Sequence, residues 1–275
     1  MTLESPQLVF GDDGSPAADV VWLWINNHPW PGWHISVVTA QPPPLGPPVG
    51  AARSSLHPWD PPSPRRLFAA DDVTQVEHLM AEADPRIVLD SCKEATLVAV
   101  GPRGKGILKQ LHIGSTAEWL VSAYRPLAPL VIIRSARRTR RVLLCVDGSV
   151  HAQQAARSLA GLPWIGDCDI TILGVRGGHA EADRGVDEAA ALLHAAGAKL
   201  LGRRLTEAIA QTATFDVRST ILDTITDIEP DLVAMGTRGL GGLRRAILGS
   251  TTSAVVHHAP CSVLIVRTHN HDDTP

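Results

Sequence analysis

The sequence predicts an α/β protein made of two tandem doubly wound domains, each with a parallel sheet covered by helices. Short apolar runs such as Arg141–Val146 and Ile170–Val175 alternate with stretches of helical spacing. Strands that are apolar on both faces are typical of a buried parallel sheet. Crossovers between parallel strands are right-handed, which favours a doubly wound order with the ligand at the carboxyl ends of the strands. An internal repeat indicates that this domain occurs twice.

A glycine frame occurs twice in the chain. Gly101–Ser115 (GPRGKGILKQLHIGS) and Gly236–Ser250 (GTRGLGGLRRAILGS) both read Gly, two residues, Gly, nine residues, Gly-Ser, and they start 135 residues apart (236 − 101). An Asp-Gly-Ser triplet recurs at Asp13 and Asp147, 134 residues apart (147 − 13), and a Pro-Trp pair follows each triplet at the same offset. Landmarks that recur in one order predict two copies of a domain of about 130 residues.

The repeat divides the chain into four parts. The first domain is expected at 1–135 and the second at 141–268, with a basic linker at 136–140 between them and a polar tail at 269–275. The linker is interpreted as a solvated hinge or, alternatively, as a segment that faces phosphate groups.

The first domain carries a proline-rich insertion at about 41–66, where the second copy has a helix. Its nine prolines exclude a helix, so a long polyproline-like or disordered loop is expected. It is interpreted either as a tolerated surface insertion or as a lid or partner-docking segment.

Apolar spacing predicts the other elements of the second copy. Helices are expected at 152–162, 187–200, 215–228 and 250–258, further strands at 231–235 and 261–266, and either strand or helix at 204–210. On the first helix of the chain, Trp22 and Trp24 lie two residues apart. Since positions i and i+2 do not share a helix face, only one of the two is expected in the core, and the other marks an inter-domain contact.

The glycine frame has the chemistry of a phosphate site. Gly236 follows a strand, where glycine permits a sharp turn with positive φ, and Gly239 lets the backbone approach a ligand closely. Ser250 opens a helix whose free amides and dipole suit a phosphate group. Positive charge surrounds each loop, from Arg238, Arg244 and Arg245 in the second copy and from Arg103, Lys105 and Lys109 in the first.

Other phosphate motifs do not fit the frame. It lacks the Gly-Lys-Ser/Thr of a Walker A loop and the third glycine of a GxGxxG loop. Asp147 ends the first strand of its copy, where its carboxylate can reach a ribose hydroxyl or a magnesium ion. No hydrolytic constellation is visible, so no catalytic or metal-ligating set is expected.

Composition narrows the function classes. A net charge of −3 and a pI near 6.4 make no case for nucleic-acid binding. No apolar run reaches about 18 residues and the N-terminus does not resemble a signal peptide, so we expect no membrane span and a cytoplasmic location. The four cysteines lack CxxC spacing and are interpreted as reduced, mostly buried thiols.

These residues resemble the universal stress protein family. The resemblance rests on the frame G-x2-G-x9-G-S, the aspartate that ends the first strand, and the closing strand Ala259–Val266 (APCSVLIV). It covers nearly the whole chain as a tandem pair and is weakest in the proline-rich insertion. It implies an adenine nucleotide alpha hydrolase-like fold with five parallel strands in each copy, and it implies ATP, with or without magnesium, as the ligand.

Carried over position by position, the resemblance implies two sets of binding residues. In the second copy they are Asp147, Val175, Met235, Gly236, Arg238, Gly239, Gly249, Ser250, Thr251 and Thr252. In the first copy they are Asp13, Ala40, Val100, Gly101, Gly104, Gly114, Ser115 and Thr116. The first copy departs from the second at Ala117, which stands where the second copy has Thr252, and at Ala40, which stands where it has Val175.

The leading hypothesis is therefore an ATP-binding regulator in stress response or growth control. A slow magnesium-dependent ATPase and a nucleotide-independent interaction scaffold are the alternatives. The resemblance also implies that the two copies pack as an intramolecular pseudo-dimer or that chains form a homo-oligomer, with a protein partner that the sequence does not identify.

Overall fold

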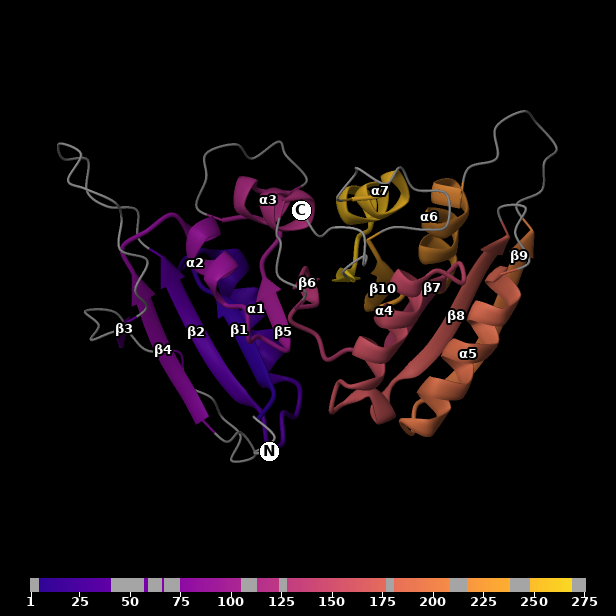
Figure 1. Cartoon of the computed structure of the whole chain (residues 1–275), viewed down its shortest axis with the longest axis horizontal. Coiled ribbons are helices and arrows are strands. Elements are labelled where there is room, and N and C mark those ends of the chain that lie inside the picture. Colours follow the sequence, from indigo (N-terminus) through magenta and orange to yellow (C-terminus); the bar gives the residue numbers. More distant parts are fainter. Residues whose placement is uncertain are drawn as a thin grey trace, which may run out of the picture. The chain divides into compact units, whose positions relative to one another are not determined.

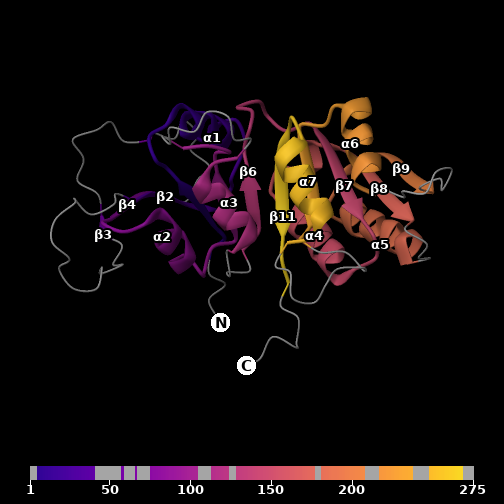
Figure 2. The same cartoon turned by 90° about the horizontal axis from the view of Figure 1, so that it is seen from above.

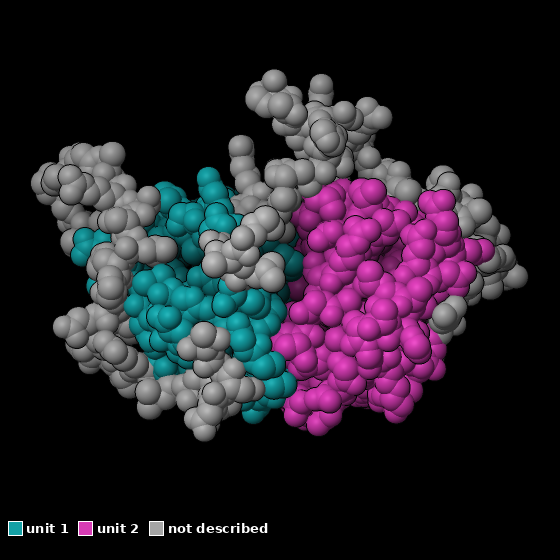
Figure 3. Space-filling model, turned by 60° about the horizontal axis from the view of Figure 1, so that its bottom comes forward, with its two compact units in different colours: residues 1–136 teal, residues 137–275 magenta. Residues whose placement is uncertain are grey.

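The computed structural model describes residues 5–40, 57–58, 66, 75–104, 113–123, 128–176, 181–207, 217–237 and 248–268. The chain separates into two compact units, Met1–Ala136 and Arg137–Pro275, coloured separately in Figure 3. Within the described residues, no helix is long and apolar enough to cross a membrane.

Unit 1 is built on one sheet (Figure 1). Its strands run in the order β3-β4-β2-β1-β5-β6, and all pair in parallel except the short β3, which is antiparallel to β4. The elements are β1 (Gln7–Gly11), α1 (Pro16–Asn26), β2 (His34–Ala40), β3 (His57–Pro58), β4 (Gln75–Ala81), α2 (Pro85–Ser91), β5 (Leu97–Val100), α3 (Ser115–Ser122) and β6 (Leu130–Ile132).

Unit 2 repeats this plan with five parallel strands in the order β11-β10-β7-β8-β9. Helices α4 and α5 pack together, and so do α6 and α7 (Figures 1 and 2). The elements are β7 (Arg141–Val146), α4 (Val150–Ala160), the 3-10 turn η1 (Ile165–Asp167), β8 (Asp169–Arg176), α5 (Glu181–Ala195), β9 (Lys199–Glu207), α6 (Val217–Ile228), β10 (Leu232–Gly236), α7 (Ser250–His258) and β11 (Ser262–Val266).

The predicted α/β class with a parallel sheet flanked by helices is confirmed in each unit. The strand order reverses beside the first strand of each unit, between β1 and β5 and between β7 and β10. Right-handed crossovers place the helices of the two halves on opposite faces of the sheet, and the crevice at such a reversal is where ligands bind in doubly wound folds. The glycine frames follow β5 and β10, directly at these two crevices.

Strand burial and helix caps explain why the sequence adopts these elements. All five residues of β10 and of β11 are buried, as expected for strands covered on both faces. The helices that follow the first strands begin alike: the Ser15 hydroxyl accepts from the Ala18 amide, and the Ser149 hydroxyl accepts from the Ala152 amide, both at 3.2 Å. These N-caps satisfy donors that the helix itself leaves unpaired.

The predicted bounds of one helix were wrong. The helix predicted at 187–200 ends at Ala195, because Gly197 adopts φ of +79° and closes the helix, and strand β9 already begins at Lys199. Residues 204–207 therefore belong to a strand, while 208–216 lie outside the described residues.

The prediction that only one of Trp22 and Trp24 faces the core was also wrong. Trp22 is 7% exposed and stacks on Phe10 of β1, whereas Trp24 is 1% exposed and meets Trp30 edge to face. Phe10 of β1 covers one face of the helix and Trp30, in the chain after α1, covers another, so both indoles have aromatic partners from unit 1.

The proline-rich insertion lies almost entirely outside the described residues. Two of its residues, His57 and Pro58, form β3 against Leu79 and Met80 of β4. Its last residue, Arg66, is also described and makes the contacts reported below.

The contact between α5 and the β7–α4 turn generates a stability prediction. A Cβ at Gly185 would lie 2.7 Å from the Gly148 amide nitrogen, which belongs to the backbone and cannot move aside. We expect Gly185→Ala to lower the free energy of unfolding by about 1–3 kcal/mol, measured by urea denaturation.

The matched control is Gly161→Ala at the end of α4. There the nearest atoms to a new Cβ lie 3.6 Å away and the backbone is α-helical, so stability should stay equal or rise by about 0.4–1 kcal/mol. Equal losses in the two variants would contradict this account of the contact.

Candidate functional site

Unit 2 has a hollow of about 90 Å³ at the carboxyl ends of β7 and β10, next to the start of α7. The structure brings five of the sequence-predicted site residues together around it: Asp147, Met235, Gly236, Thr251 and Thr252. Its other walls are Cys145, Val146, Ala152, Leu173, Val217 and Ile221. The hollow therefore has an apolar wall on one side, and the end of β10, the Asp147 carboxylate and the start of α7 form the rest of its lining.

Gly236 is required because two elements approach closely, and the predicted positive φ was wrong. The described glycines with positive φ are Gly14, Gly32, Gly148 and Gly197. Gly236 is instead the last residue of β10, where a Cβ would lie 2.7 Å from both the carbonyl carbon and the Cβ of His151. Any side chain there would push α4 away from the strand end that borders the hollow.

A backbone hydrogen bond closes the base of each glycine loop. The Gly249 amide donates to the Thr237 carbonyl at 2.7 Å, and in unit 1 the Gly114 amide donates to the Pro102 carbonyl at the same distance. Each bond joins the residue before a helix to a residue one or two positions after a strand. The start of α7 is thereby held against the end of β10, and the start of α3 against the end of β5.

The two helices that follow the loops have no side-chain cap. Their N-cap residues are Gly249 and Gly114, and neither α7 nor α3 shows a side-chain cap hydrogen bond. Helices α1 and α4, by contrast, are capped by serine hydroxyls. First-turn amides that no described side chain caps, together with the helix dipole, form an anion site of the kind that binds phosphate groups.

The hydroxyl residues at the start of α7 have different environments. Ser250 is exposed and Thr251 is half-buried on the wall of the hollow. Thr252 is 2% exposed, and its hydroxyl donates to the Gly236 carbonyl at 2.8 Å. Thr252 therefore also links α7 to β10. At Ala117, the corresponding position in α3, no such hydrogen bond can form.

The aspartates that end the first strands have the same local geometry in both units. The Asp147 Oδ1 atom accepts from the Ser149 amide, and the Asp13 Oδ1 atom accepts from the Ser15 amide, both at 3.0 Å. The intervening glycines, Gly14 and Gly148, adopt φ of +65° and +83°. This turn holds the carboxylate at the strand end, half-buried beside the hollow in unit 2.

The remaining predicted residues of unit 1 lie at the corresponding crevice. Ala40 ends β2, Val100 ends β5, and Ser115 and Thr116 open α3. Gly101 and Gly104 follow β5, and a Cβ at Gly101 would come within 3.1 Å of Ala17. A Cβ at Gly104 would collide with the Asp13 carboxylate, so the second glycine of the frame and the strand-end aspartate are in close contact.

Three predicted residues fall wholly or partly outside the described structure. Arg238 and Gly239 lie outside the described residues. The backbone of Val175 pairs with Thr206 of β9, while its side chain lies outside the described part, and Leu173 of the same strand lines the hollow.

Sequence reasoning missed the contribution of α6. Val217 and Ile221 line the hollow from one face of this helix, with Ile221 only 3% exposed. Their spacing of four residues marks one helix face, but only the fold shows that this face borders the hollow. These side chains and Leu173 make one wall apolar.

Cys145 supplies a neutral thiol to the same wall. Burial raises its thiol pKa to about 12, and the nearby Cys261 raises it further in the same direction. A thiol with this pKa stays protonated at neutral pH and is a poor nucleophile. Within the part of the chain that the structure describes, no group of three or more His, Cys, Asp or Glu side chains forms a metal site.

An ion-pair cluster distinguishes unit 1. The guanidinium of Arg66 donates to Asp12 Oδ2 at 2.7 Å and to Asp12 Oδ1 at 3.0 Å, and its other arm donates to Asp19 at 2.6 Å. Hydrogen bonding to Asp12 raises the pKa of Arg66 above its ordinary value. The last residue of the insertion is thus attached to the end of β1 and to α1.

Comparison with known proteins gives a consistent family assignment. The model of the universal stress protein family matches residues 138–267. A putative universal stress protein of Staphylococcus epidermidis is 31% identical over 140 residues, which cover 47% of this chain and 84% of that protein. One from Staphylococcus saprophyticus is 51% identical over 43 residues, but this match spans 16% of this chain and about a quarter of the relative (26%).

A solved structure resembles the chain over nearly its full length. A universal stress protein from Archaeoglobus fulgidus superimposes with a TM-score of 0.64, covering 96% of this chain and 99% of that one at 18% identity. At this identity the likeness shows a shared fold across both units.

The Thr252 hydrogen bond generates a prediction about stability. Thr252→Val keeps the side-chain shape but removes the donor to the Gly236 carbonyl, so we expect the free energy of unfolding to fall by about 1–3 kcal/mol. Thr251→Val, one position earlier and half-buried, should change it by no more than about 0.5 kcal/mol. Chemical denaturation of both variants makes the comparison, and a Thr252→Val protein as stable as the wild type would refute the role of this bond.

Proposed function

The chain belongs to the universal stress protein family, and we propose that it binds ATP and acts as a nucleotide-dependent regulator in stress response or growth control. The single observation that carries the proposal is the uncapped start of α7, which the Gly249–Thr237 hydrogen bond holds beside a hollow with an apolar wall and a carboxylate.

Each part of an adenine nucleotide has a chemically suitable partner in unit 2. Leu173, Ile221 and Met235 are apolar and suit the adenine ring. Asp147, at the strand end, suits a ribose hydroxyl or a magnesium ion that accompanies the triphosphate. The amides and hydroxyls of Ser250 and Thr251 suit the phosphates. The negative charge of a bound triphosphate would be stabilised by the amides and the dipole at the start of α7.

The proposal extends to unit 1 and to the chain as a whole. Unit 1 has the same loop-closing bond and the same uncapped helix, so we propose the two units as copies of one domain with a second, weaker site. Nucleotide binding would change how the protein meets a second chain or a protein partner in the cytoplasm, with little or no ATP turnover.

A pair of serine variants tests which unit binds ATP. Ser250→Asp and Ser115→Asp each place a carboxylate at the first position of a helix, where negative charge favours the helix dipole and folding is preserved. The same carboxylate repels a phosphate. We expect Ser250→Asp to weaken ATP binding in unit 2 by at least about tenfold, or roughly 1.4 kcal/mol. Ser115→Asp should remove only the weaker ATP binding that is proposed for unit 1.

Isothermal titration calorimetry with magnesium-ATP measures affinity and the number of sites for each variant. The double variant should bind no ATP at concentrations that saturate the wild type. ATP binding by the double variant with wild-type affinity would overturn the assignment, as would a wild-type protein that binds no adenine nucleotide. A phosphate-release assay on the same samples tests the ATPase alternative.

A further inference from the structure

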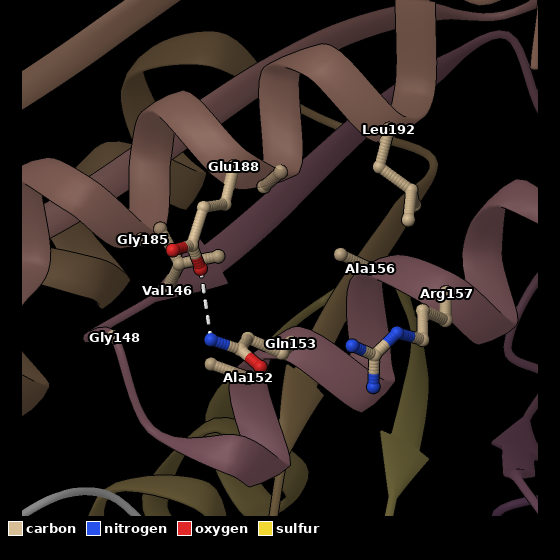
Figure 4. Close-up of a pocket in the computed structure, with 10 residues that line it drawn as sticks. Val146, Gly148, Ala152, Gln153, Ala156, Arg157, Gly185, Glu188 and Leu192 are labelled. Carbon is tan, nitrogen blue, oxygen red and sulfur yellow. Dashed lines mark hydrogen bonds between the residues drawn. The ribbon is translucent and has the colours of Figure 1, made fainter. Parts of the chain in front are cut away.

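A second hollow lies between α4 and α5 of unit 2, away from α6 and α7. Its volume is about 170 Å³ (Figure 4). Ala156 of α4 and Leu192 of α5 project toward each other across it, and Gln153 and Glu188 meet at one end. The hollow opens to solvent at the rim, where Arg157 and Glu188 are exposed, and its floor is formed by buried residues such as Ala152 and Ala189.

Small side chains keep this hollow open. Ala152 and Ala156 on α4 face Ala189 on α5, and none of the three reaches across the gap. Gly185 meanwhile contacts the Gly148 backbone. The helices are therefore close at one end and separated by the hollow beyond it.

Unit 1 provides an internal comparison, because the same position is filled there. Trp22 and Ala156 are each the seventh residue after the serine N-cap of their helix. The Trp22 indole is buried and stacks on Phe10, whereas the Ala156 methyl group leaves the space empty. Unit 1 therefore has a large side chain at this helix position, whereas unit 2 has a methyl group that leaves the hollow open.

A second pair of positions shows the same contrast. Asp12 and Asp19 of unit 1 correspond to Val146 and Gln153 of unit 2, and Arg66 forms hydrogen bonds to both aspartates. In unit 2, Val146 and Gln153 border the hollow instead. The region that holds a guanidinium in unit 1 is thus part of an open hollow in unit 2.

The rim of the hollow is polar, and one of its cations, Arg157, has no ion-pair partner among the described residues. The Gln153 amide donates to Glu188 Oε2 at 2.8 Å, and Arg184 lies 3.4 Å from Glu188 Oε1, so the carboxylate of Glu188 is already neutralised. Arg157 lines the hollow and is exposed, and none of the ion pairs among the described residues includes it. An apolar cavity with an unpaired guanidinium at its rim suits an apolar group that bears an anion.

We propose that the hollow between α4 and α5 is a second ligand site, which takes a small monocarboxylate with an apolar body about the size of a benzene ring. A cavity of about 150 Å³ accepts benzene, so the volume fits this body. The planar guanidinium of Arg157 would pair with the carboxylate in a bidentate manner. Ala156, Ala189 and Leu192 would surround the apolar body.

The site can be tested apart from the nucleotide. Val146 and Ala152 line both hollows, so they are left unchanged, and the variants are placed at Ala156, Ala189 and Arg157, which line only the second hollow. Benzoate is the probe, and benzyl alcohol is the uncharged probe of similar size. Methyl NMR spectra of the full chain, recorded without nucleotide, follow the binding of each.

We expect benzoate to shift the methyl signals of Ala156 and Leu192 in the wild type. Arg157→Gln should lower the affinity for benzoate at least tenfold and change the affinity for benzyl alcohol by less than twofold. Lys199→Gln removes a charge of the same sign from unit 2, and neither Lys199 nor its partner Asp169 lines the hollow, so this variant should change the affinity for benzoate by less than twofold. Ala156→Trp, which copies unit 1, should abolish the binding of both probes, and Ala189→Leu is the second filling variant if the first does not fold.

Two results would overturn the proposal. One is the absence of benzoate-induced shifts at these methyl groups in the wild type at millimolar concentration. The other is an equal affinity of benzoate for the wild type and for Arg157→Gln. Because magnesium-ATP binding is measured separately on the same variants, failure of this site and failure of the nucleotide site are distinguishable.

Discussion

The hydrogen bond from the Gly249 amide to the Thr237 carbonyl is the constraint on which the candidate site depends. It joins the residue after β10 to the residue before α7, so the start of α7 stays beside the end of β10. The Thr252 hydroxyl adds a second link between the same two elements through the Gly236 carbonyl. Together these bonds convert a helix start, which binds anions weakly when mobile, into a fixed group of donors at a sheet crevice.

The choice of glycine at both ends of the loop follows from the same constraint. At Gly236 the strand and α4 come so close that no Cβ fits. At Gly249 a residue without a side chain leaves the first-turn amides unsatisfied by the protein. A serine or aspartate at this N-cap would satisfy one of those amides, as Ser149 does in α4, and would compete with a ligand for it.

The internal repeat makes the two units a natural comparison. They share the strand order, the aspartate turn and the loop-closing bond. They differ at Ala117, which cannot replace the Thr252 bond, and at Trp22 and Arg66, which occupy a region that unit 2 leaves open. Each of these positions corresponds to a residue that borders one of the two hollows of unit 2 or faces that region, so unit 1 does not reproduce the walls of either hollow.

The class of fold could be predicted from the sequence, because it depends on patterns repeated within the chain. Of the predicted site residues, the structure brings Asp147, Met235, Gly236, Thr251 and Thr252 together at one hollow. The sequence was not sufficient where tertiary packing decides. The helix expected at 187–200 includes Gly197, but the positive φ of this glycine ends α5. Trp22 and Trp24 are both covered because the returning chain buries a second helix face. The roles of Val217 and Ile221 required knowledge of which helix borders the hollow.

If the start of α7 binds the ligand, the ligand must carry negative charge. Calorimetry tests this requirement by comparing the affinity for ATP with the affinity for adenosine. Both ligands present the same adenine and ribose to the apolar wall and to Asp147, so only the phosphates differ. If the uncapped helix start carries the binding, ATP should bind at least about a hundredfold more tightly than adenosine, or roughly 2.8 kcal/mol. Equal affinities for ATP and adenosine would contradict it.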